Sequence, residues 1–440
     1  MLFSGDPTKI VDAQLADFAS SAKAVMHFAV AFELEQYWLP AKPLKPLWAI
    51  YQLVAEPAGV DISFTVTDKE KPWGELLTAM QGFSDFCDAR GLPLYRANQP
   101  LRLQTVAIAK PWGQEIWYTG VEQRGVASVE GSNQLAAPLP WVMAALPQYL
   151  CGEPSGDQAR PLILLKILDP APQPVTGDLY FELHEQKREV YVVTAVDKAA
   201  WPDGIGAIRF GFKAERLAEY ASESAFKQAF SQAVKAYEQV RRQLDAQPKL
   251  NTAGALYTQE KELRAAMENF TEFLPLQVGD VVKVPCLTPH ALQHGVRTVE
   301  FQTPVYERLI VSFAQKVLTQ DHWDTDKAIE LMSLQADLNN DFEQLAASDE
   351  SAVGVKIERI VDFADFEVRR YSLPAGQQIQ LQAADDYALL MAIKGEVPVN
   401  EQLLHAEQTV FLPKAWAGAL IENTSTAEMC FLIAHPKALF

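Results

Sequence analysis

Hydrophobic and polar residues alternate with two different periods along this chain. In the first hundred residues, apolar positions recur every three or four residues over 10–22, continue through 26–39 and return over 76–86, which predicts amphipathic helices. One stretch, 60–67, alternates with period two and predicts a strand. Residues 1–104 are therefore expected to form a mostly helical region, to which the sequence assigns no role.

The pattern changes near residue 101, where short apolar runs separated by proline and glycine begin to predict strands. These runs lie at 103–106, 115–119, 162–168, 179–196, 281–284, 298–302, 308–313 and from 355 to the end. Helical periodicity interrupts them over 214–247, 258–273 and 324–345. The order of elements predicts a mainly β protein with helical additions.

Length, charge and cysteine content limit the classes of function. The chain has 440 residues, enough for two or three domains with cores of their own. Its formal net charge of −18 argues against a nucleic-acid or anionic-membrane partner, because phosphate groups attract basic surfaces. No apolar run approaches the ~20 residues that a membrane-spanning helix needs. Four separated cysteines without a C-x-x-C motif indicate reduced thiols, so we expect a cytoplasmic protein. The oligomeric state stays open.

Two polar motifs carry the candidate chemistry. Glu182, His184 and Glu189 form the pattern E-x-H-x₄-E, and a G-x₅-P-x₄-H pattern runs from Gly279 to His290. Residues two apart on a strand face the same side, so Glu182 and His184 can point into one barrel. Imidazoles and carboxylates suit Zn, Fe, Mn or Co. A lone histidine is more often a packing residue, but two of only seven histidines stand at the two required places.

The spacing of these motifs resembles the two metal-binding motifs of a cupin barrel. The resemblance predicts that Glu182, His184, Glu189 and His290 hold one divalent metal ion. Residues 351–440 look like a second barrel of the same type, in which Gly418 stands where the ligand histidine would be. We expect this C-terminal barrel to lack metal ligands and to be structural.

Several segments together resemble class I mannose-6-phosphate isomerases. They are 110–120, 162–169, 179–191, 208–213, 279–292 and 300–308. The resemblance covers about 105–350 and, more faintly, 351–440, and leaves 1–104 outside. It implies a double cupin fold of two jelly-roll barrels and a metal-binding domain over 105–350 with a helical insertion at 214–273. The helical periodicity of 1–104 adds an extra N-terminal helical region to this fold.

The family resembled here uses zinc held by Gln, His, Glu and His, and interconverts an aldose and a ketose phosphate. In this chain Glu182 replaces the family's glutamine, and the other three ligand positions match. The additional carboxylate lets the ligands cancel the charge of a divalent ion, which blunts its Lewis acidity. Tyr180 stands where the family often has a serine near the substrate phosphate, and a bulky ring there could change or exclude the phosphate.

The same resemblance suggests catalytic residues. Lys187 and Arg308 match basic residues of the family's active site, and Glu300 matches a site carboxylate and is the candidate base or proton relay. An internal ion pair with Arg308 or Lys187 is the alternative role for Glu300. The interval from Glu300 to Arg308 is shorter than in the family. Two placements stay open for Lys166: one near the site and one, which we favour, with its side chain extending from the end of the barrel toward solvent.

The expected function is a zinc-dependent aldose–ketose isomerase that acts on a sugar or sugar phosphate by proton transfer through a cis-enediol. Mannose 6-phosphate and fructose 6-phosphate are the presumed pair. Two alternatives use the same residues. One is a different metal-dependent cupin enzyme, such as a dioxygenase or an isomerase of another sugar. The other is a sugar-binding protein without catalytic activity.

Overall fold

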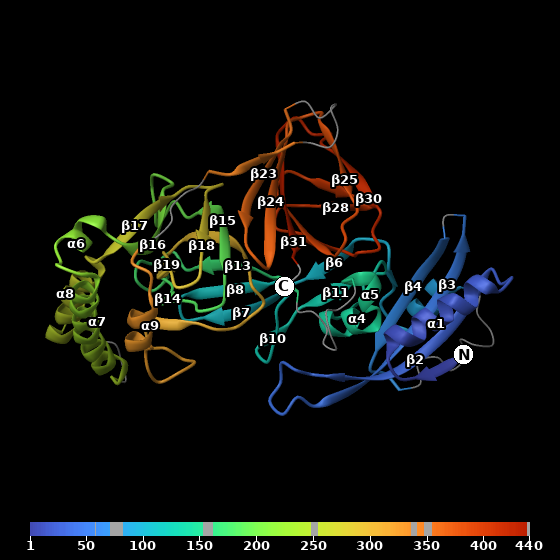
Figure 1. The fold of residues 1–440 in the computed structure, drawn as a ribbon, viewed down its shortest axis with the longest axis horizontal. Helices are drawn as coiled ribbons and strands as arrows, with labels where there is room; N and C mark the ends of the chain where they lie inside the picture. Colours follow the sequence, from blue (N-terminus) through green and yellow to red (C-terminus); the bar gives the residue numbers. More distant parts are fainter. Residues whose placement is uncertain are drawn as a thin grey trace. The chain divides into compact units, whose positions relative to one another are not determined.

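The computed structural model describes residues 1–57, 59–70, 82–152, 162–247, 254–335, 341–346 and 354–437. Its strands outnumber its helices (Figure 1), which confirms a mainly β fold with helical additions. Contacts divide the chain into two compact units. The first contains 1–106, 117–163 and 342–440, and the second contains 107–116 and 164–341. The consecutive domains 1–104, 105–350 and 351–440 remain a proposal about how the chain is divided.

A five-stranded sheet of order β1-β2-β3-β4-β5 dominates the first hundred residues. The elements described in this region are β1 (Leu2–Ser4), α1 (Pro7–Ser20), β2 (Val25–Glu35), β3 (Leu44–Glu56), β4 (Gly59–Thr67), α3 (Phe83–Arg90) and β5 (Tyr95–Arg96). The strand predicted at 60–67 is confirmed as β4, and the helix predicted over 10–22 is confirmed as α1.

The expectation of a mostly helical region over 1–104 is wrong. The misleading stretch is 26–39, most of which lies in β2. This strand pairs with β1 on one side and β3 on the other, and its middle residues are buried on both faces. A strand that is apolar on both faces reads as a continuous apolar run, which short buried helices also show. Of the stripe predicted over 76–86, residues up to 81 lie outside the described residues.

A second sheet joins strands from two distant parts of the sequence within the first unit. Its order is β12-β11-β6-β29-β26-β31-β24-β23-β22, with β6 paired to β29. The elements between residues 101 and 150 are β6 (Leu101–Gln104), β9 (Val121–Glu122), β10 (Gly125–Val126), β11 (Ser128–Glu130), β12 (Ala136–Pro138), α4 (Leu139–Ala145) and α5 (Pro147–Leu150).

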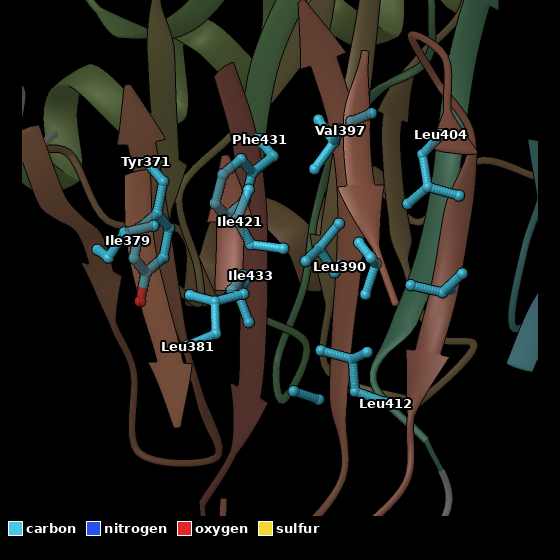
Figure 2. Packing of buried hydrophobic residues seen from close by; sticks show 14 of the residues in the cluster. Tyr371, Ile379, Leu381, Leu390, Val397, Leu404, Leu412, Ile421, Phe431 and Ile433 are labelled. Atoms are coloured by element: carbon cyan, nitrogen blue, oxygen red, sulfur yellow. The ribbon is translucent and has the colours of Figure 1, made fainter. Parts of the chain in front are cut away.

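The C-terminal part is rich in strands, as its sequence predicts, and its sheets form a sandwich. Its elements are β22 (Glu343–Leu345), β23 (Lys356–Asp362), β24 (Phe366–Leu373), β25 (Gln378–Gln382), β26 (Ala388–Lys394), β27 (Val397–Val399), β28 (Gln402–Leu404), β29 (Thr409–Leu412), β30 (Gly418–Glu422) and β31 (Met429–Pro436). The small sheets β25-β30 and β27-β28 supplement the large sheet. Side chains from all of these sheets form one apolar core (Figure 2), so we call this part the C-terminal sandwich.

The second unit contains two sheets, of order β18-β15-β20-β13-β8-β7 and β17-β16-β19-β14-β21. Their strands are β7 (Val106–Lys110), β8 (Gly113–Trp117), β13 (Leu164–Pro170), β14 (Phe181–Leu183), β15 (Glu189–Val196), β16 (Gly206–Phe212), β17 (Thr271–Leu276), β18 (Val281–Val284), β19 (His290–Leu292), β20 (Val296–Gln302) and β21 (Leu309–Ser312). Apolar residues from both sheets share one core, and we call this part the metal-site sandwich. Within the described residues, backbone hydrogen bonds close none of the sheets into a barrel.

Helices pack against the outer face of β14 and β16. They are α6 (Ala214–Ala218), α7 (Glu223–Asp245), α8 (Ala255–Glu268) and α9 (Thr325–Leu331). Ser222 caps α7 by accepting a hydrogen bond from the backbone N–H of Ala225, and the buried Phe230 of this helix contacts Phe181 of β14. Helices therefore fill most of the described part of 214–273, where the sequence predicts a helical insertion, and β17 begins at the end of this range. Within the described residues, none of the helices combines the length and apolar character that a bilayer crossing requires.

The third predicted helical tract, 324–345, is helical in only part of its described residues, and 336–340 lie outside them. The helix α9 ends at Leu331, because Met332 adopts an extended conformation with ψ of 138°. At the end of the tract, 343–345 forms β22, which pairs with β23. Tertiary pairing therefore overrides the local helical periodicity there.

Candidate metal centre

The four predicted ligands come from both sheets of the metal-site sandwich. Glu182 lies on β14 and is the register partner of His290 on the neighbouring strand β19. His184 follows β14 directly, and Glu189 begins β15 in the other sheet. Phe181 and Leu183 belong to the cluster under the helices, so strand alternation turns Glu182 to the opposite, inner face. The two sheets thus bring the two motifs together.

Three of these side chains form a tight cluster. Candidate ligand atoms of His184, Glu189 and His290 all lie within 4.8 Å of one another, and all three residues are buried. The Oε2 atom of Glu189 is 3.5 Å from Nε2 of His184 and 3.1 Å from Nε2 of His290. Glu182 lies at the edge of the cluster, with Oε1 3.9 Å from Nε2 of His184. This arrangement can hold a metal ion.

Backbone carbonyl groups orient both imidazole rings. Nδ1 of His184 is 3.0 Å from the carbonyl oxygen of Glu307, and Nδ1 of His290 is 3.0 Å from that of Thr288. A carbonyl oxygen can only accept a hydrogen bond, so each Nδ1 carries the proton. Each Nε2 then presents its lone pair to the centre of the cluster, as metal-binding histidines commonly do.

The chemistry of the donor atoms fits a divalent cation. Among the described residues, Nε2 of His184 and Oε2 of Glu182 are buried and make no hydrogen bond. Burial lowers the pKa of His184, which keeps its imidazole neutral. Burial opposes ionisation of Glu189, but Lys187 and His184 outweigh it and hold the pKa of Glu189 well below its usual range. Neutral nitrogen and ionised oxygen ligands suit zinc, and also iron, manganese or cobalt.

Tyr191 belongs to the cluster, although the sequence reasoning does not single it out. Its hydroxyl group donates to Oε2 of Glu189 at 2.7 Å and lies 3.1 Å from Nε2 of His290. Burial, followed by the charge of Glu189, raises the pKa of Tyr191 well above its usual value, so the phenol stays protonated. Tyr191 is two residues beyond Glu189 on the same strand, and the period of two could have identified it.

Glu307 is a second residue that the sequence reasoning misses. Its Oε1 accepts hydrogen bonds from the backbone N–H groups of Gln186 and Lys187 at 2.9 and 3.0 Å. Together with the carbonyl bond to His184, this carboxylate holds the turn between the two halves of the first motif. Burial acts to raise the pKa of Glu307, but the backbone donors outweigh it and lower that pKa. No local pattern links Glu307 to a turn more than a hundred residues earlier.

Two predicted catalytic residues lie beside the cluster. Lys187 pairs with Oε1 of Glu189 at 2.5 Å. Glu300 is the register partner of Lys166 on one side and of Tyr191 on the other, so the three side chains form a row across β13, β20 and β15. Lys166 is buried and lies 3.2 Å from Oε2 of Glu300. The expectation that Lys166 extends to solvent is therefore wrong, because buried carboxylates compensate its charge.

The environment of Glu300 is unusual for a carboxyl group. Burial and the nearby carboxylate of Glu189 raise the pKa of Glu300 well above its usual range, although Lys166 and Lys187 act to lower it. Among the described residues, its Oε1 is buried and makes no hydrogen bond. A second carboxylate, Glu115 of β8, lies 3.8 Å from the other side of Lys166. Glu300 therefore forms an internal ion pair with Lys166, whereas the sequence suggested Arg308 or Lys187 as its partner, and its second oxygen atom makes no hydrogen bond to the described residues.

Arg308 lies at the more exposed edge of the cluster. Its side chain is 23% exposed and that of Glu182 is 17% exposed, and Nε of Arg308 is 3.8 Å from Oε2 of Glu182. The guanidinium group lies 4.4 Å from the centre of the Tyr180 ring and donates to Oγ1 of Thr319 at 2.8 Å. Tyr180 is itself buried, with its ring 4.1 Å from that of Phe313. Arg308 therefore lies close to one of the predicted ligands, Glu182.

Comparisons with known proteins identify the fold. No family model and no curated protein sequence matches the chain. Mannose 6-phosphate isomerase from Bacillus subtilis is similar in structure, with a TM-score of 0.55 and 15% identity over 77% of this chain and 99% of that chain. A zinc-bound mannose 6-phosphate isomerase has a TM-score of 0.56 and 13% identity over 77% of this chain and all of that chain.

A point mutant of phosphomannose isomerase from Salmonella typhimurium gives a similar result, with a TM-score of 0.55 and 13% identity over 76% of this chain and 99% of that chain. At these identities the likeness shows the fold alone. It confirms the predicted double cupin architecture, and the resemblance noted in the sequence holds at the level of the fold. Neither the substrate nor the reaction follows from it.

Proposed function

We propose that the chain is a metal-dependent aldose–ketose isomerase, with zinc as its metal and mannose 6-phosphate, fructose 6-phosphate or a related sugar as its substrate. One observation carries the proposal, namely the cluster of His184, Glu189 and His290 in a chain with this fold. The solved relatives are described as isomerases of a sugar phosphate and, in one case, as zinc bound. The proposal extends both properties to this chain.

In this proposal His184, Glu189 and His290 hold the ion, and Glu182 completes the set from the neighbouring strand. When bound, a divalent ion would polarise the carbonyl group of a sugar and so acidify the C–H bond beside it. The carboxylate of Glu182 reduces the net charge of the centre compared with a neutral ligand. Arg308 stands close enough to Glu182 to offset part of that added charge.

The side chains around the cluster have separate proposed roles. Glu300 transfers the proton between the two carbon atoms, and its buried Oε1, which makes no hydrogen bond to the described residues, supports this role. Lys166 holds Glu300 in place through its ion pair. Arg308 binds the enediolate or a phosphate by charge-assisted hydrogen bonds from the exposed edge. Lys187 provides a second positive group and holds Glu189.

Metal analysis of the purified protein, joined to a coupled assay with mannose 6-phosphate and fructose 6-phosphate, tests this proposal. We expect zinc and interconversion in both directions, and we expect His290→Ala to lose both. His294→Ala is a matched control, because this neighbouring histidine pairs with Asp178 and lies outside the cluster. Metal retained in His290→Ala would contradict the ligand assignment.

The same measurements separate the two alternative functions. Tightly bound iron together with oxygen uptake would indicate a different cupin enzyme. A metal-loaded protein that binds a sugar phosphate without converting it would indicate a sugar-binding protein. Either result would be consistent with the metal cluster and would contradict the proposal that the protein is an isomerase.

A further inference from the structure

The C-terminal sandwich contains a cavity of about 470 Å³. It lies where β24 begins and β31 ends, and apolar side chains form much of its wall. In Figure 2 the side chains of Ile379, Leu381 and Ile433 lie close together beside Tyr371, between the strands. All four of these residues are at most 6% exposed, so the wall is a continuation of the sandwich core.

Strand alternation turns charged residues into this cavity. On β24, Glu367 and Arg369 share the inner face with Tyr371, which belongs to the apolar core. On β31, His435 shares the inner face with Ile433 and is the register partner of Glu367. Inward positions of a sandwich are ordinarily apolar. A polar end to an otherwise apolar interior therefore needs an explanation beyond packing.

The charges at this end compensate one another. Glu367 is only 6% exposed and pairs with Arg369 and, at 3.1 Å, with Arg359. Burial, followed by the charge of Arg369, lowers the pKa of His435 to about 4, so the imidazole is neutral near pH 7. Among the described residues, none forms a hydrogen bond with that imidazole. The ring thus keeps one donor and one acceptor for another molecule.

We propose that this cavity binds an uncharged, hydroxyl-bearing small molecule of about the size of a monosaccharide. The apolar wall suits the C–H face of such a ligand, while His435, Arg369 and Glu367 offer both donors and acceptors to its hydroxyl groups. The volume lies within the range of roughly 300–1,000 Å³ that is usual for small-molecule sites.

The charge balance argues against an ionic ligand. The guanidinium of Arg369 is already paired with Glu367, and Asp385 and Asp386 also line the cavity, so an anion would meet no uncompensated positive group there. A cation would compete with two arginines for Glu367. The inference does not depend on the proposed isomerase, because every residue named for this cavity belongs to the first unit.

Ligand-detected NMR titrations test the proposal. The protein is the full-length His290→Ala variant, in which we expect the metal ion to be lost. The probes are mannose, fructose and mannose 6-phosphate. We expect saturable binding of at least one neutral sugar, with the phosphorylated sugar binding more weakly. His435→Phe should weaken the binding of the neutral sugar by about tenfold or more, which is the effect of losing one hydrogen-bonding group. His405→Phe is the control, because His405 lies in the same sandwich and is 59% exposed.

Three results would overturn the proposal. The first is no binding of either neutral sugar up to about 20 mM, where even a weak complex would be populated. The second is binding of mannose 6-phosphate that is tighter than that of mannose and that weakens in His435→Phe, because such binding would place a phosphate in this cavity. The third is unchanged affinity in His435→Phe. If that variant does not fold, Ala384→Trp replaces it, since Ala384 lines the cavity and a large ring there should fill part of it.

Discussion

The metal-site sandwich and the C-terminal sandwich both direct ionisable side chains inward, but they compensate the charges of these side chains differently. In the first, imidazole nitrogens and a carboxylate converge within 4.8 Å, and buried donor atoms are left without hydrogen bonds to the described residues. In the second, two arginines neutralise Glu367 and a single neutral histidine stands beside them. The comparison teaches that strand alternation supplies an inward position, while the residue types around it decide whether a cation can bind there.

One backbone position explains why the second sandwich does not repeat the first. Gly418, where the motif would require a histidine, has a φ of +94°. A Cβ atom built there would lie 2.3 Å from the carbonyl oxygen of Leu381. No side chain fits without moving the backbone of β25, so the missing histidine is enforced by the fold as well as by the sequence.

The largest expected effect is on metal content, and it differs between the two inward-facing glutamates, Glu189 and Glu367. Glu189→Ala should lose the metal, because it removes the oxygen atom that both cluster histidines approach. Glu367→Gln should leave the metal content unchanged, since Glu367 pairs only with arginines among the described residues. Elemental analysis of both purified variants checks this difference. Loss of metal in Glu367→Gln would remove the distinction between the sandwiches.

Arg308→Ala should reduce kcat by about 10² to 10³, a typical effect of removing one donor that stabilises developing charge. The metal should stay, because Arg308 reaches the cluster only through Glu182. Steady-state kinetics and metal content, measured on the same preparation, test both parts. Arg370→Ala is the control, because Arg370 pairs with Glu358 in the C-terminal sandwich. An active Arg308→Ala enzyme would contradict the proposed role.

Glu307→Ala should weaken metal binding by about 10- to 100-fold, the usual effect of removing a group that orients metal ligands. The lost contacts are the two backbone hydrogen bonds to the turn after His184. Glu307→Gln keeps an acceptor oxygen and should bind metal nearly as well as the wild type. Competition with a chelator measures these affinities.

Glu185→Ala provides the control for Glu307. It removes a carboxylate from the same turn, but one that pairs with the exposed Lys327. Equal metal affinity in Glu307→Ala and Glu307→Gln would show that the carboxylate does not hold the ligands.

The smallest expected effect is a decrease in the free energy of unfolding at low pH, which arises from His435 in the C-terminal sandwich. The pKa of His435 is about 4 in the folded protein, below the 6.5 of an unperturbed histidine. The unfolded state therefore takes up a proton first as the pH falls below 6.5, and the free energy of unfolding decreases. The loss between pH 7 and pH 5 should be about 2 kcal/mol. Urea unfolding at both pH values should show a smaller loss in His435→Gln than in the wild type.

Much of the candidate site could be predicted from the sequence. Two-residue spacing predicted that Glu182 and His184 share a face, and the second motif identified His290, because strand alternation and tight turns are local properties. Gly418 likewise predicted that the C-terminal sandwich lacks metal ligands, and this stays a prediction. The strand-rich texture after residue 101 and the helical insertion also follow from local periodicity.

The rest of the fold and of the site depends on pairing between strands that are distant in sequence. The row of Lys166, Glu300 and Tyr191 exists only because β20 lies between β13 and β15. Glu307 meets the turn after His184 across more than a hundred residues. The sheet in the first hundred residues replaced the expected helices because β2 pairs on both sides. Such contacts join segments that are distant in sequence, and local patterns of polarity contain no information about which strands will become neighbours.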